Sequence, residues 1–270
     1  MNQELVSVIM PTFNAGRYLS ASIESILGQT YQNLELLISD DGSTDDRTLR
    51  LLKEYADKDP RVKVDYLEGN CGPGVARNNS IKKAQGRYIA FCDSDDRWFP
   101  EKLEKQIALM EAKDCALTCT SYITCDANDE ETGIVVAPER ITFQMMKHDN
   151  KVGCLTAVYD TKKLGQKYFM PEIRKRQDWA MFLSIIKKSG PAYALTEPLA
   201  LYRQRDNSIS SKKFSLIKYN IKVYETILGY PKWKASLYFL FIFIPTYYLK
   251  VLKRNIDSWN YLRKKERIKE

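Results

Sequence analysis

The chain has 270 residues, 44% hydrophobic and 28% charged, which is the composition of an ordinary globular protein and excludes a disordered or collagen-like chain. Lysine and arginine number 42 against 34 acidic residues, but the excess lies in residues 211–270, where 14 basic residues face 4 acidic ones. Because nucleic-acid proteins are usually basic in their folded body and residues 1–210 are not, the charge distribution predicts no nucleic-acid partner.

Residues 5–112 alternate between strand-like and helix-like patterns. Short apolar runs predict strands at 5–10, 34–38, 62–67 and 87–92. Apolar residues at helical spacing predict helices at 19–27, 49–56 and 75–84, and Pro100 precedes a fourth helix at 101–112. Regular alternation of this kind predicts an α/β fold with a doubly wound, mostly parallel sheet.

The pattern loosens after Cys115. A strand-like segment at 116–125 is followed by a polar turn at 126–133, a short amphipathic segment at 141–146 and a helix at 178–188. Small polar residues and lysines near 208–213 precede two further helical stretches, at 214–228 and 234–262. We therefore divide the chain into a main domain, residues 1–210, and a basic, aromatic-rich helical tail, residues 211–270.

Acidic residues directly follow two of the predicted strands. Residues 40–46 read Asp-Asp-Gly-Ser-Thr-Asp-Asp, and residues 93–96 read Asp-Ser-Asp-Asp. Ligands of open parallel sheets bind beyond the carboxyl ends of the strands. Crowded carboxylates there suit Mg²⁺ or Mn²⁺ that shares its ligand shell with substrate phosphates. The alternative is that these aspartates are turn and helix N-cap residues.

A glycine-rich turn at 69–74 opens the helix predicted at 75–84 and places Arg77 in its second turn, which favours an anion. The sequence lacks the dinucleotide fingerprint, because residues 11–14 read Pro-Thr-Phe-Asn where the first strand should lead into G-x-G-x-x-G. A Walker lysine-serine pair is also missing. These features favour one nucleotide with a metal on its diphosphate.

Four motifs now stand in a specific order, at residues 7–14, 39–45, 74–78 and 93–96. In this order the chain resembles the family 2 inverting glycosyltransferases of the GT-A fold, of the bacterial surface-polysaccharide type, over roughly residues 5–210. Residues 175–179 resemble the family's Glu/Gln-Asp motif. Residues 201–203 with 208–210 resemble its closing loop.

The resemblance implies a donor site for a UDP-sugar. Pro11 and Phe13 would hold the base, and Asp41 would accept a hydrogen bond from the uracil ring N–H. Arg77 would lie near the base or the diphosphate, and Asp93 would contact the ribose or the sugar.

The resemblance also implies the catalytic groups. Asp95 would ligate a Mg²⁺ or Mn²⁺ ion that bridges the two phosphates, and Asp178 would be the general base that activates the acceptor hydroxyl. The alternative for Asp178 is a helix N-cap. Related proteins often carry a histidine at the position of Arg205, so we expect Arg203 and Arg205 to clamp the diphosphate instead.

The tail holds a long apolar run. Residues 235–249 carry no charge, and residues 237–244 are all apolar. Fifteen helical residues span about 22 Å, short of a hydrocarbon core of about 30 Å, and Pro245 interrupts the run. We expect the segment to lie in one leaflet with its basic flanks on anionic headgroups. The alternative is a helix packed against the main domain.

Resemblance and tail together imply a metal-dependent inverting hexosyltransferase. It would move a hexose or N-acetylhexosamine from a UDP-sugar to a polyprenyl-diphosphate-linked saccharide in O-antigen or capsule synthesis. The first residues lack a signal-peptide pattern, so we expect a cytoplasmic protein, peripheral or monotopic at the inner face of the membrane. The alternatives are transfer to polyprenyl phosphate, or a catalytically silent membrane-bound binding module.

Overall fold

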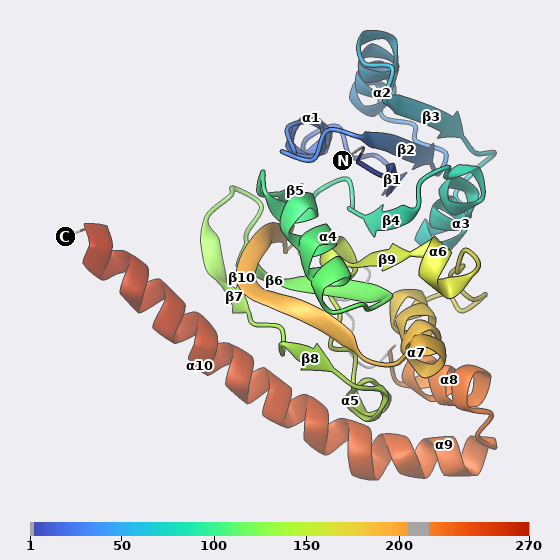
Figure 1. Cartoon of the computed structure of the whole chain (residues 1–270), viewed down its shortest axis with the longest axis vertical. Coiled ribbons are helices and arrows are strands. Elements are labelled where there is room, and N and C mark those ends of the chain that lie inside the picture. The colour runs from blue at the N-terminus through green and yellow to red at the C-terminus, as the bar shows by residue number, and fades with distance from the viewer. Residues whose placement is uncertain (1–2, 205–215, 270) are drawn as a thin grey trace.

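The computed structural model describes residues 3–204 and 216–269. Its strands are β1 (Val6–Thr12), β2 (Leu34–Asp40), β3 (Val62–Tyr66), β4 (Tyr88–Phe91), β5 (Arg97–Trp98), β6 (Leu117–Cys125), β7 (Glu131–Val135), β8 (Arg140–Ile141), β9 (Val158–Asp160) and β10 (Ala192–Arg203). They form one sheet in the order β3-β2-β1-β4-β9-β6-β10-β5, with β7 beside β6 and β8 beside β10 (Figure 1).

Helices connect and cover these strands. They are α1 (Leu19–Leu27), α2 (Asp46–Lys58), α3 (Pro73–Lys83), α4 (Lys102–Ala112), α5 (Phe143–His148), α6 (Thr161–Leu164), α7 (Gln177–Ser189) and α8 (Ile217–Leu228), with a short 3-10 helix, η1 (Cys154–Thr156). The predicted helices of the first 112 residues are therefore present, with ends shifted by a few residues.

The sheet is parallel in its first half and mixed in its second. β1 pairs in parallel with β2 and β4, and β2 pairs in parallel with β3. β9 is antiparallel to both of its neighbours, whereas β6 and β10 are parallel to each other. The parallel half was expected from the β/α alternation. The mixed half has no such pattern, because β9 is only three residues long.

The sheet is covered on both faces. Along β1, Val8 and Met10 pack in a cluster that includes Ile23 of α1 and residues of α2 and α4. The intervening Ile9 packs in a second cluster that includes Ile81 of α3 and residues of α7 and α8. Because side chains alternate between the two faces of a strand, a fully apolar strand needs cover on both sides. The predicted doubly wound α/β architecture is confirmed.

The helical stretch predicted at 234–262 is present, and it continues through Pro245. α9 (Lys232–Tyr238), a π-helical turn η3 (Phe239–Phe243) and α10 (Ile244–Lys269) follow one another as one long helix (Figure 1). A proline inside a helix lacks an N–H and crowds the carbonyl four residues before it. The wider π turn accommodates Pro245, so the expected interruption is wrong. By length and composition alone, Lys232–Arg267 could cross a membrane.

One side of this long helix packs against the rest of the protein. Phe239 and Phe243 are buried in the same cluster as α7. Farther along, the Ser258 hydroxyl accepts a 3.0 Å hydrogen bond from the Ile134 amide. The Tyr261 hydroxyl donates to the Glu131 carboxylate at 2.7 Å. The boundary predicted near 208–213 lies outside the described residues, and beyond it α8 joins the core of the main domain.

A lysine is fully buried at the start of α4. The side chain of Lys102 is not exposed, and its Nζ lies 3.7 Å from the centre of the Trp98 ring. Among the described residues it has no hydrogen-bond partner. Burial lowers the pKa of Lys102 from 10.5 to about 7, although the nearby Cys92 and Cys119 thiols oppose this. An ammonium group in this position costs folding free energy.

We predict that Lys102→Met raises the melting temperature at pH 7 by about 2 to 10 °C, since an unpartnered buried donor costs about 1–3 kcal/mol. Between pH 7 and 10 the unfolded chain binds more protons at this lysine than the folded one, so the contribution of Lys102 to wild-type stability rises with pH. The gain should therefore shrink toward pH 10, as thermal unfolding at several pH values can measure. The control Lys105→Met, at a half-exposed side chain, should change little. Equal melting temperatures for Lys102→Met and wild type at pH 7 would contradict the prediction.

Candidate active site

The ends of β2 and β4 and the start of α3 meet at the carboxyl edge of the parallel half of the sheet. Asp41 follows β2, Asp93 and Asp95 follow β4, and Arg77 lies in α3. This is the edge at which open α/β sheets bind ligands. The motifs found in the sequence therefore fall on one side of the molecule.

Asp41 holds the glycine-rich loop. Its two carboxylate oxygens accept hydrogen bonds from the amides of Cys71 and Gly72, both at 2.8 Å. Gly42 has φ 77°, and a Cβ there would lie 2.8 Å from the backbone of Gly69. Because only glycine permits this conformation and this approach, the two loops are held together by backbone as well as by Asp41.

Two other aspartates of the 40–46 segment are turn and helix N-cap residues, which was the alternative to a role at a metal site. Asp40 accepts a hydrogen bond from the Ser43 amide at 3.0 Å. Asp45 is the N-cap of α2 and accepts from the amides of Arg47 and Thr48. These contacts are the ordinary ones for turn and cap residues.

The two residues that were expected to hold the nucleotide base lie at the end of β1. Pro11 is buried and pairs with Ser39 of the neighbouring strand. Phe13 follows the strand and is 45% exposed. An exposed aromatic ring beside polar loops is a suitable surface on which a nucleotide base can stack.

Arg77 lies at the centre of the site. It is 8% exposed and forms an ion pair with Asp93, the predicted sugar contact. Burial is the largest single effect and opposes its charge, but the interactions with Asp93, Cys154 and Asp178 together outweigh burial and raise the pKa of the Arg77 guanidinium. The structure thus brings together three predicted site residues from three separate elements.

Asp178 is the second residue of α7 and does not cap it. The N-cap position is held by Arg176 at φ 67°, without a side-chain cap hydrogen bond. The Asp178 carboxylate instead accepts a 3.1 Å hydrogen bond from Asn150 Nδ2. The N-cap alternative is therefore wrong for Asp178, and its carboxylate is available for another role.

α3 fixes the start of α7 from the other side. Asn78 donates to the Met170 carbonyl at 2.8 Å and accepts from the Met170 amide at 2.7 Å. A Cβ on Gly74 would lie 2.2 Å from the side-chain amide of Gln177, so a larger residue at position 74 would require the Gln177 side chain to move. The glycine-rich loop therefore packs directly on the element that carries Asp178.

Asp95 and Asp96 differ in their surroundings. Asp95 is partly exposed, whereas Asp96 is 1% exposed and accepts from the Arg203 amide at 2.9 Å. Burial raises the pKa of Asp96 well above its usual range, and the charges of Asp95 and Asp93 add to this. Within residues 3–204 and 216–269, no group of three or more metal-binding side chains is found. Asp95 fits a single-carboxylate contribution to a metal held jointly with substrate phosphates.

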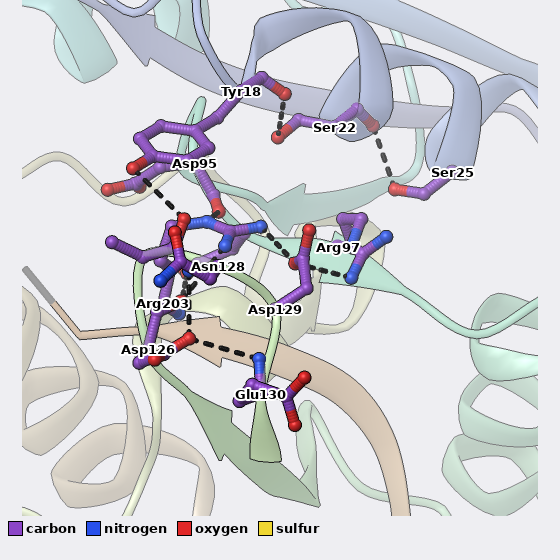
Figure 2. A network of polar contacts seen from close by, with 12 residues as sticks. Tyr18, Ser22, Ser25, Asp95, Arg97, Asp126, Asn128, Asp129, Glu130 and Arg203 are labelled. Atoms are coloured by element: carbon purple, nitrogen blue, oxygen red, sulfur yellow. Dashed lines mark hydrogen bonds and ion pairs between the residues drawn. The ribbon is translucent and has the colours of Figure 1, made fainter. Parts of the chain in front are cut away.

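Arg203 is engaged by the protein itself. At the end of β10 its guanidinium donates to the carbonyls of Asp95 and Asp126, at 3.1 and 3.0 Å, and to the Asp129 carboxylate at 2.5 Å (Figure 2). It also lies 4.3 Å from the centre of the Tyr18 ring. The side chain is only 2% exposed. For Arg203 to bind the diphosphate as predicted, these contacts would have to break. The second residue of the predicted clamp, Arg205, lies outside the described residues.

Sequence reasoning missed several residues of this network. Asn78, Asn150 and Asp129 bind partners that are 92, 28 and 74 positions away in the sequence, respectively. No local sequence pattern can therefore identify them. Only Asn78 had a signal, because it ends the motif at 74–78. The large side chains Trp98 and Trp179 are buried packing residues, each with its ring N–H bonded to a backbone carbonyl.

Comparisons with known proteins identify the family and the fold. The sequence model described as Glycosyl transferase family 2 matches residues 7–166. TuaG of Bacillus subtilis, a glycosyltransferase assigned to teichuronic acid biosynthesis, is 43% identical over 224 residues, 83% of this chain and 88% of its own length.

Two further matches concern substrates and fold. WfgD of Escherichia coli, named UDP-Glc:α-D-GlcNAc-diphosphoundecaprenol β-1,3-glucosyltransferase, is 38% identical over 248 residues, 90% of this chain and 94% of its length. The crystal structure of S. aureus TarS 1–349 with UDP-GlcNAc aligns with a TM-score of 0.64 at 22% identity, over 87% of this chain and 73% of that chain. The predicted GT-A fold is confirmed.

We predict that Arg203→Met lowers the free energy of unfolding by about 1–3 kcal/mol, because the carbonyls of Asp95 and Asp126 lose their charged donor, whereas the half-exposed Asp129 carboxylate keeps Arg97. Arg97→Met is the matched control, since Arg97 binds the same carboxylate at 2.7 Å but is 34% exposed. The control should cost less than about 1 kcal/mol. Urea unfolding measures both. Unchanged stability of Arg203→Met together with lost UDP binding would instead favour the diphosphate clamp.

Proposed function

The chain belongs to glycosyl transferase family 2, and we propose that it transfers a hexose or N-acetylhexosamine from a UDP-sugar to a polyprenyl-diphosphate-linked saccharide with inversion at the anomeric carbon. The observation that carries the proposal is the convergence of Arg77, Asp93 and Asp178 at the carboxyl edge of the sheet. The printed substrates of WfgD and the UDP-GlcNAc bound to TarS support this substrate class.

The donor would lie along the strand ends. Phe13 offers an exposed ring for the base. Asp41 already accepts two backbone amides, but each carboxylate oxygen keeps a second acceptor site, so it can also receive the uracil N–H. Arg77 would lie near the nucleotide base or the diphosphate, and Asp93 would contact the ribose or the sugar. Arg203 and Arg205 stay proposed as a clamp on the diphosphate.

The transfer is a single displacement. The acceptor hydroxyl oxygen forms a bond to the anomeric carbon while Asp178 takes the hydroxyl proton. The bond from that carbon to the diphosphate oxygen breaks, and its electron pair leaves with UDP. Attack from the face opposite the leaving group inverts the configuration, so an α-linked donor gives a β-linked product. The β linkage in the name of WfgD is consistent with this outcome.

A divalent cation completes the proposed donor site. Asp95 would hold Mg²⁺ or Mn²⁺ together with the two phosphates, because these ions often take one or two protein carboxylates and fill their shell with phosphate oxygens and water. When bound, the ion supplies positive charge that stabilises the departing UDP. Asp93 forms an ion pair with Arg77, and the partly exposed Asp95 is the ligand that we propose for this segment.

We predict that Asp178→Asn lowers turnover by about 10² to 10⁴ because the amide cannot accept the hydroxyl proton. The assay measures UDP release with a synthetic α-GlcNAc-diphospholipid acceptor. Asparagine keeps the size of the side chain and an acceptor for Asn150, so UDP binding by calorimetry should stay within about twofold of wild type.

Asp95→Ala provides the matched comparison, since it should lose metal-dependent UDP binding as well as turnover. Binding in the presence of EDTA should be the same for this variant and wild type. An Asp178→Asn enzyme with wild-type turnover would show that another group is the base. Metal-independent UDP binding by the wild type would remove Asp95 from the metal site.

The outer side of the long C-terminal helix supports the proposed membrane partner. Large side chains recur on both sides of the π turn, and all of them are exposed. We call this set the stripe: Trp233, Leu237, Phe241, Ile244, Tyr248, Leu252, Ile256 and Trp259. Exposed basic residues flank the stripe. The opposite side of the helix packs on the protein, so the proposed orientation is parallel to the membrane surface, at its inner face.

We predict that the triple variant Phe241→Ser, Tyr248→Ser, Trp259→Ser binds anionic phospholipid vesicles at least about tenfold more weakly, because three exposed apolar side chains are lost. Co-sedimentation with vesicles measures the change. Phe169→Ser is the control, since Phe169 is 43% exposed and lies outside the long helix. Equal vesicle binding by the triple variant and wild type would refute the membrane role of the stripe.

A further inference from the structure

We propose that the C-terminal helix positions the catalytic base, through a chain of contacts that runs from Lys250 to Asn150 to Asp178. The inference rests on the proposed role of Asp178 as the base. It makes the tail a working part of the active site, in addition to its proposed contact with the membrane.

The first contact joins the helix to the segment after α5. Lys250 Nζ donates to the Asn150 carbonyl at 2.6 Å and forms a 2.7 Å ion pair with the Asp149 carboxylate. The Asp149 side chain is only 3% exposed, and its other cation, Lys151, is farther away at 3.4 Å. A buried carboxylate needs a cation, so Lys250 is the closer of the two groups that hold this segment.

The second contact joins that segment to the base. The Asn150 side-chain oxygen accepts a 3.1 Å hydrogen bond from the Val152 amide. This fixes the orientation of the Asn150 amide, so its nitrogen faces Asp178 and donates to Oδ2 at 3.1 Å. One carboxylate oxygen of Asp178 is therefore held by Asn150, which sets the direction of the other.

A packing contact supports the same connection. Trp179, the residue after Asp178, is fully buried, and its ring centre lies 5.6 Å from that of Phe243 in the long helix. The Trp179 ring N–H donates to the Met146 carbonyl of α5 at 2.7 Å. The long helix thus contacts both the residue next to the base and the segment that binds the base.

The consequence of this arrangement is kinetic. A general base must lie within hydrogen-bonding distance of the acceptor hydroxyl and point toward it. Without Asn150, rotation of the Asp178 carboxylate is less restricted, and misplacement by about 1 Å can cost about 10²-fold in rate. The donor site lies on other elements, so its affinity should not depend on Lys250.

The test is Lys250→Met in the full chain, assayed in detergent micelles with the synthetic α-GlcNAc-diphospholipid, so that vesicle binding does not enter. We expect kcat to fall about 10- to 100-fold while the KM for the UDP-sugar stays within about twofold. Lys250→Arg should restore much of the rate. Lys253→Met is the matched control and should match wild type, because Lys253 is exposed and forms its ion pair with Asp257, on its own helix.

A double-mutant cycle separates positioning from general destabilisation. Asn150→Ala should lower kcat by a similar factor, and adding Lys250→Met to it should lower kcat little further, since both act on one carboxylate. Should Lys250→Met fail to fold, Asn150→Ala, which removes no ion pair, still tests the contact with Asp178.

The outcomes separate the two proposals. Wild-type kcat in Lys250→Met or in Asn150→Ala, with Asp178→Asn inactive, would overturn the positioning role and leave the base assignment intact. Fully additive losses in the cycle would also overturn it. Wild-type turnover in Asp178→Asn would instead remove the proposed base, and the inference with it.

Discussion

The buried charge of Arg77 is the constraint around which the site is arranged. A guanidinium that is 8% exposed requires negative groups nearby, and Asp93 meets this need from the end of β4. Asp178 approaches the same charge from α7. The neighbouring Asn78 binds the backbone at Met170, on the segment that leads into α7. One turn of α3 therefore joins the ion pair of the proposed donor site to the segment that leads to Asp178, the proposed general base.

The sequence carries strong information about the parallel half of the fold. Apolar runs with regular helices between them predict β1 to β4, and the polar residues that follow these strands predict the edge where the site lies. Neighbouring parts of the chain determine these features, which is why a pattern reveals them. β9 is too short for a pattern, and it lies between β4 and β6 only because the tertiary fold places it there.

Residue roles were harder to predict than elements, because roles depend on partners. Asp178 and Asp45 both stand at helix starts, yet Asp45 caps its helix and Asp178 does not, since Arg176 takes the cap position. Arg203 was expected at the diphosphate, and the structure places its guanidinium among Asp95, Asp126 and Asp129. Asp129 and Asp126 lie in a turn that is far from Arg203 in the sequence, so the residues around Arg203 do not predict these contacts.

The π turn before Pro245 also sets the phase of everything that follows it. A π turn holds one residue more than an α turn, and one residue corresponds to a rotation of about 100° around the helix axis. With this turn, Lys250 faces the protein while Tyr248 and Trp259 face outward. Removing one residue from Phe239–Phe243 would turn the rest of the helix by about that angle. The segment would still be helical, but Lys250 would no longer face Asp149, and the exposed side chains Tyr248 and Trp259 would point in a different direction.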